Sequence, residues 1–546
     1  MRVERGAEIA WNDQCDVLIA GFGAAGACAA IEAARAGASV IVTDRFGGGG
    51  ASAKSGGVVY AGGGTRYQKA AGYDDTPDAM YEYLRHEVGD AVSDSTLRSF
   101  CDQSIAMVEW LESLGVEFDS TVPPRKTSYP ADGYYLYYSG NEAIKEYAGA
   151  HPPAPRGHRV KGLGLSGAVL FKALRKAVLA AGAKVMTQSA VRRLVIDAHD
   201  GSVLGAEVWQ IDPGSDAAKR HKRLSRWAER LFPAGSLGDR LRRRALALEL
   251  AAAKPRLIRA RGGVVLSTGG FIFNRAMVSR HAPKYLRIFR LGTAGCDGSG
   301  IRLGQSAGGA CAHLERISAW RFINPPFAWV RGMIVDREGR RFCNEEVYGA
   351  RLGYEMCEHH GGKAWLVIDS AIRRDAMRES IFGGLWLFQS GPAIVLMLIG
   401  SKRSRSIDDL AGRLKIDPGT LRQTLEAYNG AAQTGGDPLG KSRDMTQALE
   451  KPPFYAMEIS ADRQVFPCPA LTLGGLRVEE GTGAVLTVGG SAVPGLYAAG
   501  RAAVGIASNH YVSGLALADC IWSGRRAGRA GALAANTSAN QVRAIA

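Results

Sequence analysis

The sequence feature that most limits the possible fold is a glycine motif close to the N-terminus. A short apolar strand is expected at residues 16–20, an alanine-rich helix at residues 27–36, and a second strand at residues 39–43. Between the first strand and the helix stands the motif Gly21-Phe22-Gly23-Ala24-Ala25-Gly26. In such a unit the first glycine makes a tight turn, the second admits a pyrophosphate to the helix N-terminus, and the third lets helix and strand pack. The pattern predicts a dinucleotide-binding domain, in which Asp44 after the second strand binds a ribose hydroxyl.

The length of the chain predicts more than one domain. A single hydrophobic core stops growing near about 250–300 residues, and this chain has 546. Strand-turn-helix patterns occupy both ends of the chain, whereas the middle has fewer tight glycine turns. We expect a discontinuous dinucleotide-binding domain at residues 1–275 and 456–535, with a cap domain inserted at residues 276–455. A basic insert is expected at about residues 212–256, and a flexible tail at residues 536–546.

The positive charge is concentrated in one segment. The formal net charge is +16, and residues 219–244 hold ten Lys or Arg and two Asp or Glu, which is half of the excess. Leu224, Trp227, Leu231 and Phe232 recur there at helical spacing, as in basic amphipathic helices that lie on anionic membranes. A solvated charged helix is the alternative that this pattern leaves open. The sequence contains no recognised nucleic-acid-binding module, so nucleic acid is not expected as a partner.

Cysteine usage and hydropathy bear on the cellular compartment. The nine cysteines are scattered, which argues against a disulfide framework, a zinc site or a haem attachment. The first fifteen residues lack the apolar region of a secretory signal. Residues 381–400 form the most apolar run, but glycines and Pro392 interrupt it, so a buried or interfacial element is expected there. We expect a cytoplasmic protein without bound metal; contact with a membrane surface through residues 219–244 and 381–400 is the alternative location.

Further motifs along the chain resemble those of a known superfamily. They are Ala51–Gly57 (ASAKSGG), Ser267–Phe271 (STGGF), Gly295–Gly300 (GCDGSG) and Gly495–Arg501 (GLYAAGR). Together with the first motif they resemble the fumarate reductase/succinate dehydrogenase flavoproteins. The resemblance implies an α/β fold, with a discontinuous Rossmann-like FAD-binding domain and an inserted α+β cap. The cofactor implied is FAD, held non-covalently, because no clear histidine tether lies near Ser52.

The same resemblance implies a set of residues around FAD. Residues 190–191 would meet the adenine, and the helix that begins after Gly514 would direct its positive end at the flavin pyrimidine ring, which is anionic when reduced. The full set is Gly21, Gly23, Ala24, Ala25, Gly26, Asp44, Arg45, Ser52, Ser55, Gly56, Gly57, Val191, Thr268, Gly269, Gly270, Asn274, Gly298, Gly500, Arg501, Gly514, Leu515 and Ala516.

Within the superfamily the chain is most similar to FAD-dependent 3-ketosteroid dehydrogenases that act at the 4,5-bond. The similarity lies in Tyr134–Glu142, Pro153–His158 and His510–Asp519. It implies that Tyr511 polarises the 3-keto oxygen, that Ser513 takes or relays the α-proton, and that flavin N5 takes the β-hydrogen as hydride. The implied partners are a hydrophobic steroid and an external electron acceptor. A purely structural role in capping the final helix is the alternative for both side chains.

Serine alone is a poor base, so Ser513 needs a partner. The resemblance suggests a tyrosine from elsewhere in the chain, and the sequence does not choose among Tyr138, Tyr348 and Tyr354.

Two other functions stay open from the sequence. Reduction of a small dicarboxylate would use cationic clamps, for which Arg331, Arg351 and His359 near Asn344-Glu345 are candidates. The spacing from Glu345 to Arg351 is longer than expected for that chemistry, and the apolar run at residues 381–400 suits a sterol-sized ligand better. A flavoprotein that only transfers electrons would lack a substrate-sized pocket beside flavin N5.

Overall fold

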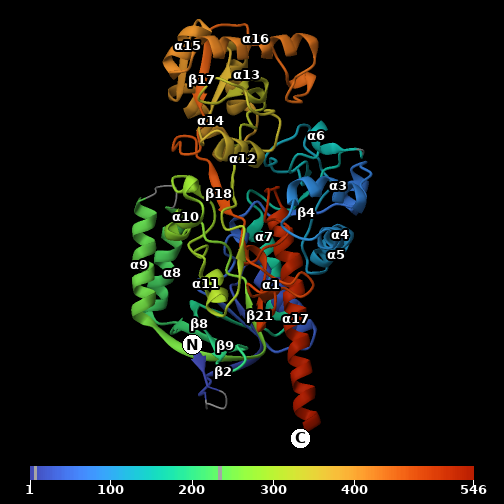
Figure 1. The fold of residues 1–546 in the computed structure, drawn as a ribbon, viewed down its shortest axis with the longest axis vertical. Coiled ribbons are helices and arrows are strands. Elements are labelled where there is room, and N and C mark those ends of the chain that lie inside the picture. The colour runs from blue at the N-terminus through green and yellow to red at the C-terminus, as the bar shows by residue number, and fades with distance from the viewer. Residues whose placement is uncertain (5–8, 150, 232–235, 546) are drawn as a thin grey trace.

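The β-α-β unit expected from the glycine motif lies at the centre of the largest sheet. The computed structural model describes residues 1–4, 9–149, 151–231 and 236–545. Strand β2 (Asp13–Ala20), helix α1 (Ala24–Arg35) and strand β3 (Val40–Asp44) follow one another, and the two strands pair in parallel. Figure 1 shows this sheet in the lower part of an elongated molecule, near both chain termini, with a second part stacked above it.

The large sheet has nine strands drawn from distant parts of the sequence. Seven of them lie in the order β1-β8-β9-β10-β2-β3-β7, and β21 joins β10 while β20 joins β21. The remaining strands are β1 (Arg2–Val3), β7 (Lys184–Thr187), β8 (Ser189–Asp197), β9 (Val203–Ile211), β10 (Ala253–Leu266), β20 (Ala484–Leu486) and β21 (Ala492–Ala498). Val264 of β10 pairs in parallel with Leu496 of β21, so the chain returns to this sheet near its C-terminal end. The discontinuous Rossmann-like domain is therefore confirmed.

Helix α17 (Leu515–Ile545) packs along α1 at very short range. A Cβ atom at Gly524 would overlap the carbonyl oxygen of Ala25, and one at Gly528 would overlap that of Ala29. Only glycine allows two helix backbones to approach this closely, and the alanines of α1 assist. The helix continues through Ile545, so the structure places residues 536–545 in α17, where we expected a flexible tail.

Smaller elements surround the large sheet. A three-stranded sheet has the order β4-β6-β5 and is packed among helices. The elements are β4 (Val58–Tyr60), β5 (Leu136–Tyr137), β6 (Gly157–Arg159), α2 (Arg66–Ala70), α3 (Pro77–Val88), α4 (Asp94–Asp102), α5 (Ser104–Ser113), α6 (Lys145–Ala148) and α7 (Gly167–Ala180).

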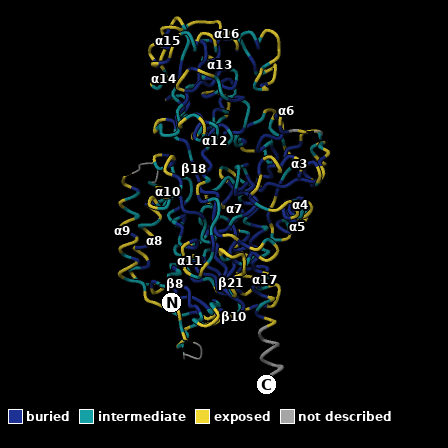
Figure 2. The backbone as a smooth tube through the Cα atoms, viewed as in Figure 1, coloured by how far each residue is buried: buried dark blue, intermediate teal, exposed yellow. Residues whose placement is uncertain are grey.

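The basic insert is a helical hairpin between the antiparallel strands β9 and β10. Its helices are α8 (Asp216–Arg230) and α9 (Ser236–Ala252), which Figure 1 shows side by side at the left of the molecule. His221 and Glu249 are buried on the inner side of the hairpin, whereas much of its outer side is exposed (Figure 2). Residues 232–235, including the expected apolar residue Phe232, lie outside the described residues.

The cap has its own sheet and its own hydrophobic core. The four antiparallel strands lie in the order β14-β15-β17-β16. The strands are β14 (Met333–Val335), β15 (Trp365–Ile368), β16 (Ser401–Ser404) and β17 (Phe454–Glu458). The helices are α12 (Gly349–His359), α13 (Ser370–Phe382), α14 (Leu387–Ile399), α15 (Ile407–Leu414) and α16 (Pro418–Thr434). The inserted α+β cap is confirmed.

Short strands and two helices connect the cap to the FAD-binding domain. Strand β18 (Pro469–Thr472) pairs with β11 (Phe289–Arg290) and β13 (Ile317–Ala319), and β12 (Cys311–Ala312) pairs with β19 (Gly475–Leu476). Helices α10 (Arg275–His281) and α11 (Ser299–Ser306) lie in the same region.

Residues 381–400 contain the end of α13 and the whole of α14. Pro392 lies inside α14, and one side of this segment packs into the cap core while Phe382, Leu387 and Ile399 are exposed. Among the described residues, none of the helices combines the length and the apolar character that crossing a bilayer requires.

Candidate active site

The glycine motif builds an anion-binding helix N-terminus. Gly21 has a φ of +107°, and a Cβ at Gly26 would overlap the carbonyl oxygen of Gly21, which explains two of the three glycines from the fold itself. Gly23 differs, because a Cβ there would meet its nearest neighbour, Ser52 Oγ, at 3.6 Å. Helix α1 begins without a side-chain cap on Gly23 and without an acidic residue in its first turn. The space beside Gly23 and the positive helix end fit a pyrophosphate, as FAD requires.

Asp44 closes the loop that follows the motif. Its carboxylate accepts hydrogen bonds from Phe22 N at 3.0 Å, from Phe46 N at 2.8 Å and from Gly48 N at 3.1 Å. Arg45, the next residue, pairs with Glu249 of α9 at 2.8 Å and with Asp297 at 2.9 Å. The hairpin α8–α9 is therefore attached directly beside the carboxylate that we expect at the ribose.

Helices α1 and α17 lie side by side and direct their positive N-terminal ends the same way. The contacts Gly524–Ala25 and Gly528–Ala29 show that the helices run in parallel. Leu515 precedes Gly524 by nine residues, whereas α1 begins just before Ala25, so α17 starts about 12 Å further out than α1. Neither first turn contains an acidic residue. Two helix ends with partial positive charge at this offset suit one dinucleotide, with its pyrophosphate at α1 and its flavin ring at α17.

Other residues expected at FAD occupy the loops around these helix ends. Ser52 lies on the 3-10 helix Ser52–Lys54, and its Oγ accepts the Ala24 N–H at 3.1 Å. A Cβ at Gly500 would lie 3.0 Å from the Ala25 side chain, so the second part of the domain closes against α1. Asn274 caps α10 by accepting the Met277 N–H at 3.1 Å. The contacts of the remaining set with FAD stay a prediction, namely Ser55, Gly56, Gly57, Val191, Thr268, Gly269, Gly270, Gly298, Arg501, Gly514, Leu515 and Ala516.

Ser513 is in contact with two tyrosines just before α17. Its Oγ lies 3.0 Å from the Tyr137 hydroxyl, and the side chain of Tyr348 in the cap is close enough to interact with Ser513. Tyr348 is the residue before α12. Of the three tyrosines expected as partners, the structure therefore brings Tyr348 to the serine. Burial raises the pKa of Tyr137 and of Tyr348 far above the usual value, so both hydroxyls stay protonated near neutral pH.

The other two candidate tyrosines lie elsewhere, and the sequence analysis missed Tyr137. Tyr354 stacks edge-on against His510, and the Tyr138 hydroxyl donates to Pro153 O at 3.2 Å. Side chains alternate across a strand, so Tyr137 at the end of β5 points to the side opposite Tyr138. The alternation of side-chain direction along residues 134–138 was the signal that could have distinguished Tyr137 from Tyr138.

Tyr511 lies beside Ser513 in an aromatic group. Its ring centroid is 4.4 Å from that of Trp320, which in turn is 5.8 Å from Phe322, and Phe322 is 5.8 Å from Tyr348. Burial raises the pKa of the Tyr511 hydroxyl well above its usual value, so it is a neutral hydrogen-bond donor. The arrangement combines a donor, a serine with two tyrosine hydroxyls, and flat apolar walls.

The cations proposed as dicarboxylate clamps are already paired, and of the three Arg351 lies near this site, 3.3 Å from His510 Nε2. Arg331 pairs with Asp375 at 2.9 Å, Arg351 pairs with Glu355 at 2.8 Å, and His359 lies 3.9 Å from Glu355. Within the part of the chain that the structure describes, these three cations form no group that would hold two carboxylates of a substrate.

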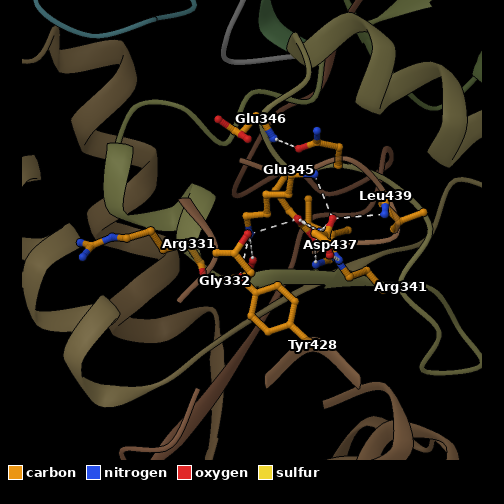
Figure 3. Close-up of polar contacts among 12 residues, drawn as sticks. Arg331, Gly332, Arg341, Glu345, Glu346, Tyr428, Asp437 and Leu439 are labelled. Atoms are coloured by element: carbon orange, nitrogen blue, oxygen red, sulfur yellow. Dashed lines mark hydrogen bonds and ion pairs between the residues drawn. The ribbon is translucent and has the colours of Figure 1, made fainter. Parts of the chain in front are cut away.

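Glu345 belongs to a buried cluster inside the cap (Figure 3). Its carboxylate pairs with Arg341 at 2.7 Å and with Lys441 at 3.2 Å, and Arg341 also pairs with Asp437. Burial favours the neutral carboxyl, but Lys441 and Arg341 outweigh it and hold the pKa of Glu345 below its usual value. This cluster stabilises the cap and leaves Glu345 unavailable to a ligand.

Among the described residues, no group of three or more His, Cys, Asp or Glu side chains is arranged to hold a metal ion. All nine cysteines are free thiols.

Known proteins resemble this chain over most of its length. The FAD binding domain family matches residues 16–514. The 3-oxo-5-alpha-steroid 4-dehydrogenase of Comamonas testosteroni is 46% identical over 506 residues, which cover 90% of this chain and 93% of that protein.

Solved structures give the same picture of the fold. The 3-ketosteroid-Δ4-(5α)-dehydrogenase of Rhodococcus jostii, solved with 4-androstene-3,17-dione, has a TM-score of 0.82 and 30% identity, and the match covers 97% of this chain and 99% of that one. A 3-ketosteroid Δ1-dehydrogenase of Sterolibacterium denitrificans has a TM-score of 0.67 at 19% identity over 96% of this chain and 100% of that one, which shows the shared fold. This chain therefore belongs to the FAD-dependent oxidoreductases of the 3-ketosteroid 4-dehydrogenase family.

Proposed function

We propose that this protein dehydrogenates a 3-ketosteroid between C4 and C5. The observation that carries the proposal is the hydrogen bond between Ser513 and the Tyr137 hydroxyl, with Tyr348 nearby, directly beside Tyr511 and the start of α17. The relatives at 46% and 30% identity are dehydrogenases of 3-ketosteroids by name, and the second was solved with a steroid. The aromatic side chains beside Tyr511 offer flat apolar walls of the kind that a fused ring system contacts.

The roles of the side chains follow from their protonation. The Tyr511 hydroxyl donates a hydrogen bond to the C3 carbonyl oxygen, which makes the protons on C4 more acidic. Ser513 Oγ accepts one C4 proton as its own hydroxyl proton passes to the oxygen of Tyr137 or Tyr348, and that tyrosine releases its former hydroxyl proton to water. Bound FAD supplies the acceptor for the C5 hydrogen, which leaves with its electron pair as hydride. Loss of one proton and one hydride leaves the C4–C5 double bond.

Flavin bleaching under anaerobic conditions tests this function directly. Protein purified with FAD is mixed with a 5α-3-ketosteroid, with a 5β-3-ketosteroid, and in parallel with succinate, and the flavin absorbance is followed. We expect bleaching by at least one steroid and none by succinate. Bleaching by succinate alone would refute the steroid function in favour of dicarboxylate chemistry. Bleaching by none of the three would leave only an electron-transfer role.

Tyr511→Phe separates catalysis from cofactor binding. The variant retains the ring that packs on Trp320 and loses only the hydroxyl. We expect normal FAD content and a decrease in kcat of about 100-fold or more, typical of losing a single oxyanion donor. Tyr138→Phe is the matched control, because that hydroxyl donates to the loop carbonyl of Pro153. Unchanged turnover of Tyr511→Phe would exclude the residue from the mechanism.

We also propose that the protein contacts an anionic membrane surface, from which a hydrophobic substrate could enter. Phe382, Leu387 and Ile399 are 80%, 83% and 80% exposed, and the exposed Lys402 and Arg403 follow them on β16. On the hairpin, Trp227 is exposed on α8 among exposed basic residues. Apolar side chains flanked by cations are typical of interfacial segments.

Vesicle sedimentation tests the membrane proposal. We expect the protein to sediment with phosphatidylglycerol vesicles and not with phosphatidylcholine vesicles, and to be released by high salt. The triple variant Phe382→Ser, Leu387→Ser, Ile399→Ser should lose sedimentation and retain FAD. Equal sedimentation with both lipids, or none with either, would refute it.

A further inference from the structure

We infer that Asn141 is a positioning residue that couples the cap to the proton-accepting serine. The inference rests on the proposed function of Ser513 and Tyr348. Asn141 touches neither the serine nor the expected steroid position, and it acts through the backbone of Tyr348. Asn141 lies within the Tyr134–Glu142 segment that carries the family resemblance, but its role depends on contacts between segments far apart in the sequence.

One short segment, residues 137–142, holds both halves of the serine site. The Tyr137 hydroxyl lies 3.0 Å from Ser513 Oγ, and the carbonyl oxygen of Ser139 accepts the Ser513 N–H at 3.1 Å. Asn141 Oδ1 accepts the N–H of Tyr348 at 2.7 Å, across the boundary between the FAD-binding domain and the cap. The segment therefore fixes the serine by its backbone and the cap tyrosine by a single amide side chain.

The amide of Asn141 is itself rigidly held. Asn141 is 2% exposed, and its Nδ2 donates to Glu87 Oε1 at 2.9 Å. Its backbone N–H donates to the Tyr83 hydroxyl at 2.9 Å, and that hydroxyl donates to the same Glu87 oxygen at 2.9 Å. Burial raises the pKa of Glu87, which the hydrogen bonds from Asn141 and Tyr83 only partly oppose. A buried amide with both ends bonded has one orientation, so Oδ1 is a fixed reference point.

Glu87 also connects this network to the segment that carries Tyr511. The carbonyl oxygen of Glu87 accepts the His510 N–H at 2.9 Å and the Asn509 side-chain amide at 3.1 Å. One residue of α3 is thus bonded to the segment before Tyr511 and, through Asn141, to the segment that carries Tyr348. The network sets the distance between the carbonyl donor and the proton relay.

From its own side the cap holds Tyr348 by its carbonyl oxygen, which accepts the N–H groups of Arg351 at 2.8 Å and Leu352 at 3.2 Å. The preceding Glu345 is held in the buried ion cluster, and the carbonyl of Glu346 accepts a hydrogen bond from Lys126 at 2.9 Å. The N–H of Tyr348 precedes α12 and is met by Asn141. A proton relay needs oxygen atoms about 2.6–3.2 Å apart, and a misplacement of about 1 Å can cost about 100-fold in rate. Loss of the Asn141 amide should therefore impair proton transfer more than substrate binding.

Asn141→Leu tests the inference, because leucine is close to asparagine in size and lacks the amide. The protein is purified with FAD and assayed with a 5α-3-ketosteroid and an artificial electron acceptor. We expect FAD content near wild type, KM within about threefold, and kcat lower by about 10- to 100-fold. The isotope effect on kcat should increase with the C4-deuterated steroid and not with the C5-deuterated one, because only the proton step is impaired.

Two further variants control the experiment. Asn429→Leu makes the same change within the cap, where Asn429 bridges backbone groups of Leu449, and it should leave kcat and both isotope effects unchanged. Asn141→Asp retains an acceptor for the Tyr348 N–H, so its kcat should exceed that of Asn141→Leu at least about fivefold. If the leucine variant is not obtained as a soluble flavoprotein, Asn141→Ala is judged by the same criteria.

The outcomes separate this inference from the proposed function. Wild-type protein that is not reduced by any steroid refutes the proposed function. Two results overturn only the role of Asn141, provided that the wild-type protein turns over. In the first, Asn141→Leu has the kcat of wild type; in the second, Asn141→Leu and Asn141→Asp have equal kcat. A lower kcat with an unchanged C4 isotope effect overturns it as well. That result would mean that the variant is less active for a general reason, such as lower stability, and not because its proton step is slower.

Discussion

In the FAD-binding domain α1 and α17 meet backbone to backbone through Gly524 and Gly528, whereas the cap buries Glu345 between Arg341 and Lys441. The first contact excludes side chains and depends on shape. The second depends on charge, and each ion is costly to bury unless its partners are present. A dinucleotide demands backbone amides at close range, so glycine sets the geometry of one domain. The cap has no such demand, and buried charges fix how its strands and helices fit together.

The largest effect should come from Gly26→Ala. The new Cβ would overlap the carbonyl oxygen of Gly21, so β2 and α1 must separate. We expect protein that is insoluble or without FAD, measured as the ratio of flavin to protein absorbance. Gly23→Ala is the matched control, because its Cβ meets Ser52 Oγ at an ordinary 3.6 Å. The Gly23→Ala variant should fold and lose affinity for FAD. A stable Gly26→Ala protein with full FAD content would contradict the prediction that close backbone contact requires glycine there.

The next largest effect should come from Lys441→Met in the cap. The substitution removes a fully buried cation that contacts Glu345 and also donates to Gly332 O at 2.7 Å. Breaking a buried pair typically costs about 3–5 kcal/mol in the free energy of unfolding. Urea denaturation followed by tryptophan fluorescence measures the loss, with the exposed Lys402→Met on β16 as the control near zero. Equal midpoints for the two variants would show that the cluster does not stabilise the cap.

A pH dependence distinguishes the buried carboxylates of the two domains. Burial raises the pKa of Asp519 in α17 to about 6 from an ordinary 3.8, and Arg526 opposes this only in part. The folded state therefore binds more protons than the unfolded state between about pH 4 and pH 6, so this group's contribution to stability falls as pH rises through that window. Above it the cost reaches at most about 3 kcal/mol.

Asp519→Asn should remove that cost. We expect the variant to be more stable than wild type at pH 7.5 and to lose this advantage at pH 4.5, as measured by urea denaturation. An advantage that is the same at both pH values would mean that Asp519 does not titrate in this range. Glu345 should show the opposite sign, since its cations lower its pKa.

The smallest effect should come from Gly412→Ala in α15. A Cβ there meets nothing within 4 Å, and the position is inside a helix. Alanine should raise the free energy of unfolding by about 0.5–1 kcal/mol. The same substitution at Gly528, where the Cβ overlaps Ala29 O, should destabilise the protein. Thermal unfolding of both variants measures the contrast. If Gly528→Ala is as stable as Gly412→Ala, the contact between α17 and α1 does not require glycine.

The sequence was informative where one ligand dictates the residues. Gly21, Gly26 and Asp44 could be placed because the β-α-β unit that binds a pyrophosphate requires those residue types at fixed spacing. Tyr511 and Ser513 followed from a resemblance. Tyr137 and Asn141 could not be placed, because their roles depend on which way a strand residue faces and on contacts with Ser513, Glu87 and Tyr348.

The cap and the insert were less predictable for a related reason. The ion cluster around Glu345 joins positions almost a hundred residues apart, and no local pattern marks them as partners. The charged segment at residues 219–244 suggested one amphipathic helix, but the structure has two helices that bury His221 and Glu249 against the FAD-binding domain. Pairing of Glu249 with Arg45 is a tertiary contact that charge patterning alone does not reveal.

The pairing of β10 with β21 has a consequence for biosynthesis. Val264 cannot pair until Leu496 has been synthesised, so the nascent chain exposes an unpaired edge of β10 throughout translation of the cap. The cap, whose sheet draws only on residues 333–458, can finish folding on the ribosome before the cofactor site exists. Loading of the flavin is then a late event, and a polypeptide that terminates before β21 would leave that edge open to aggregation.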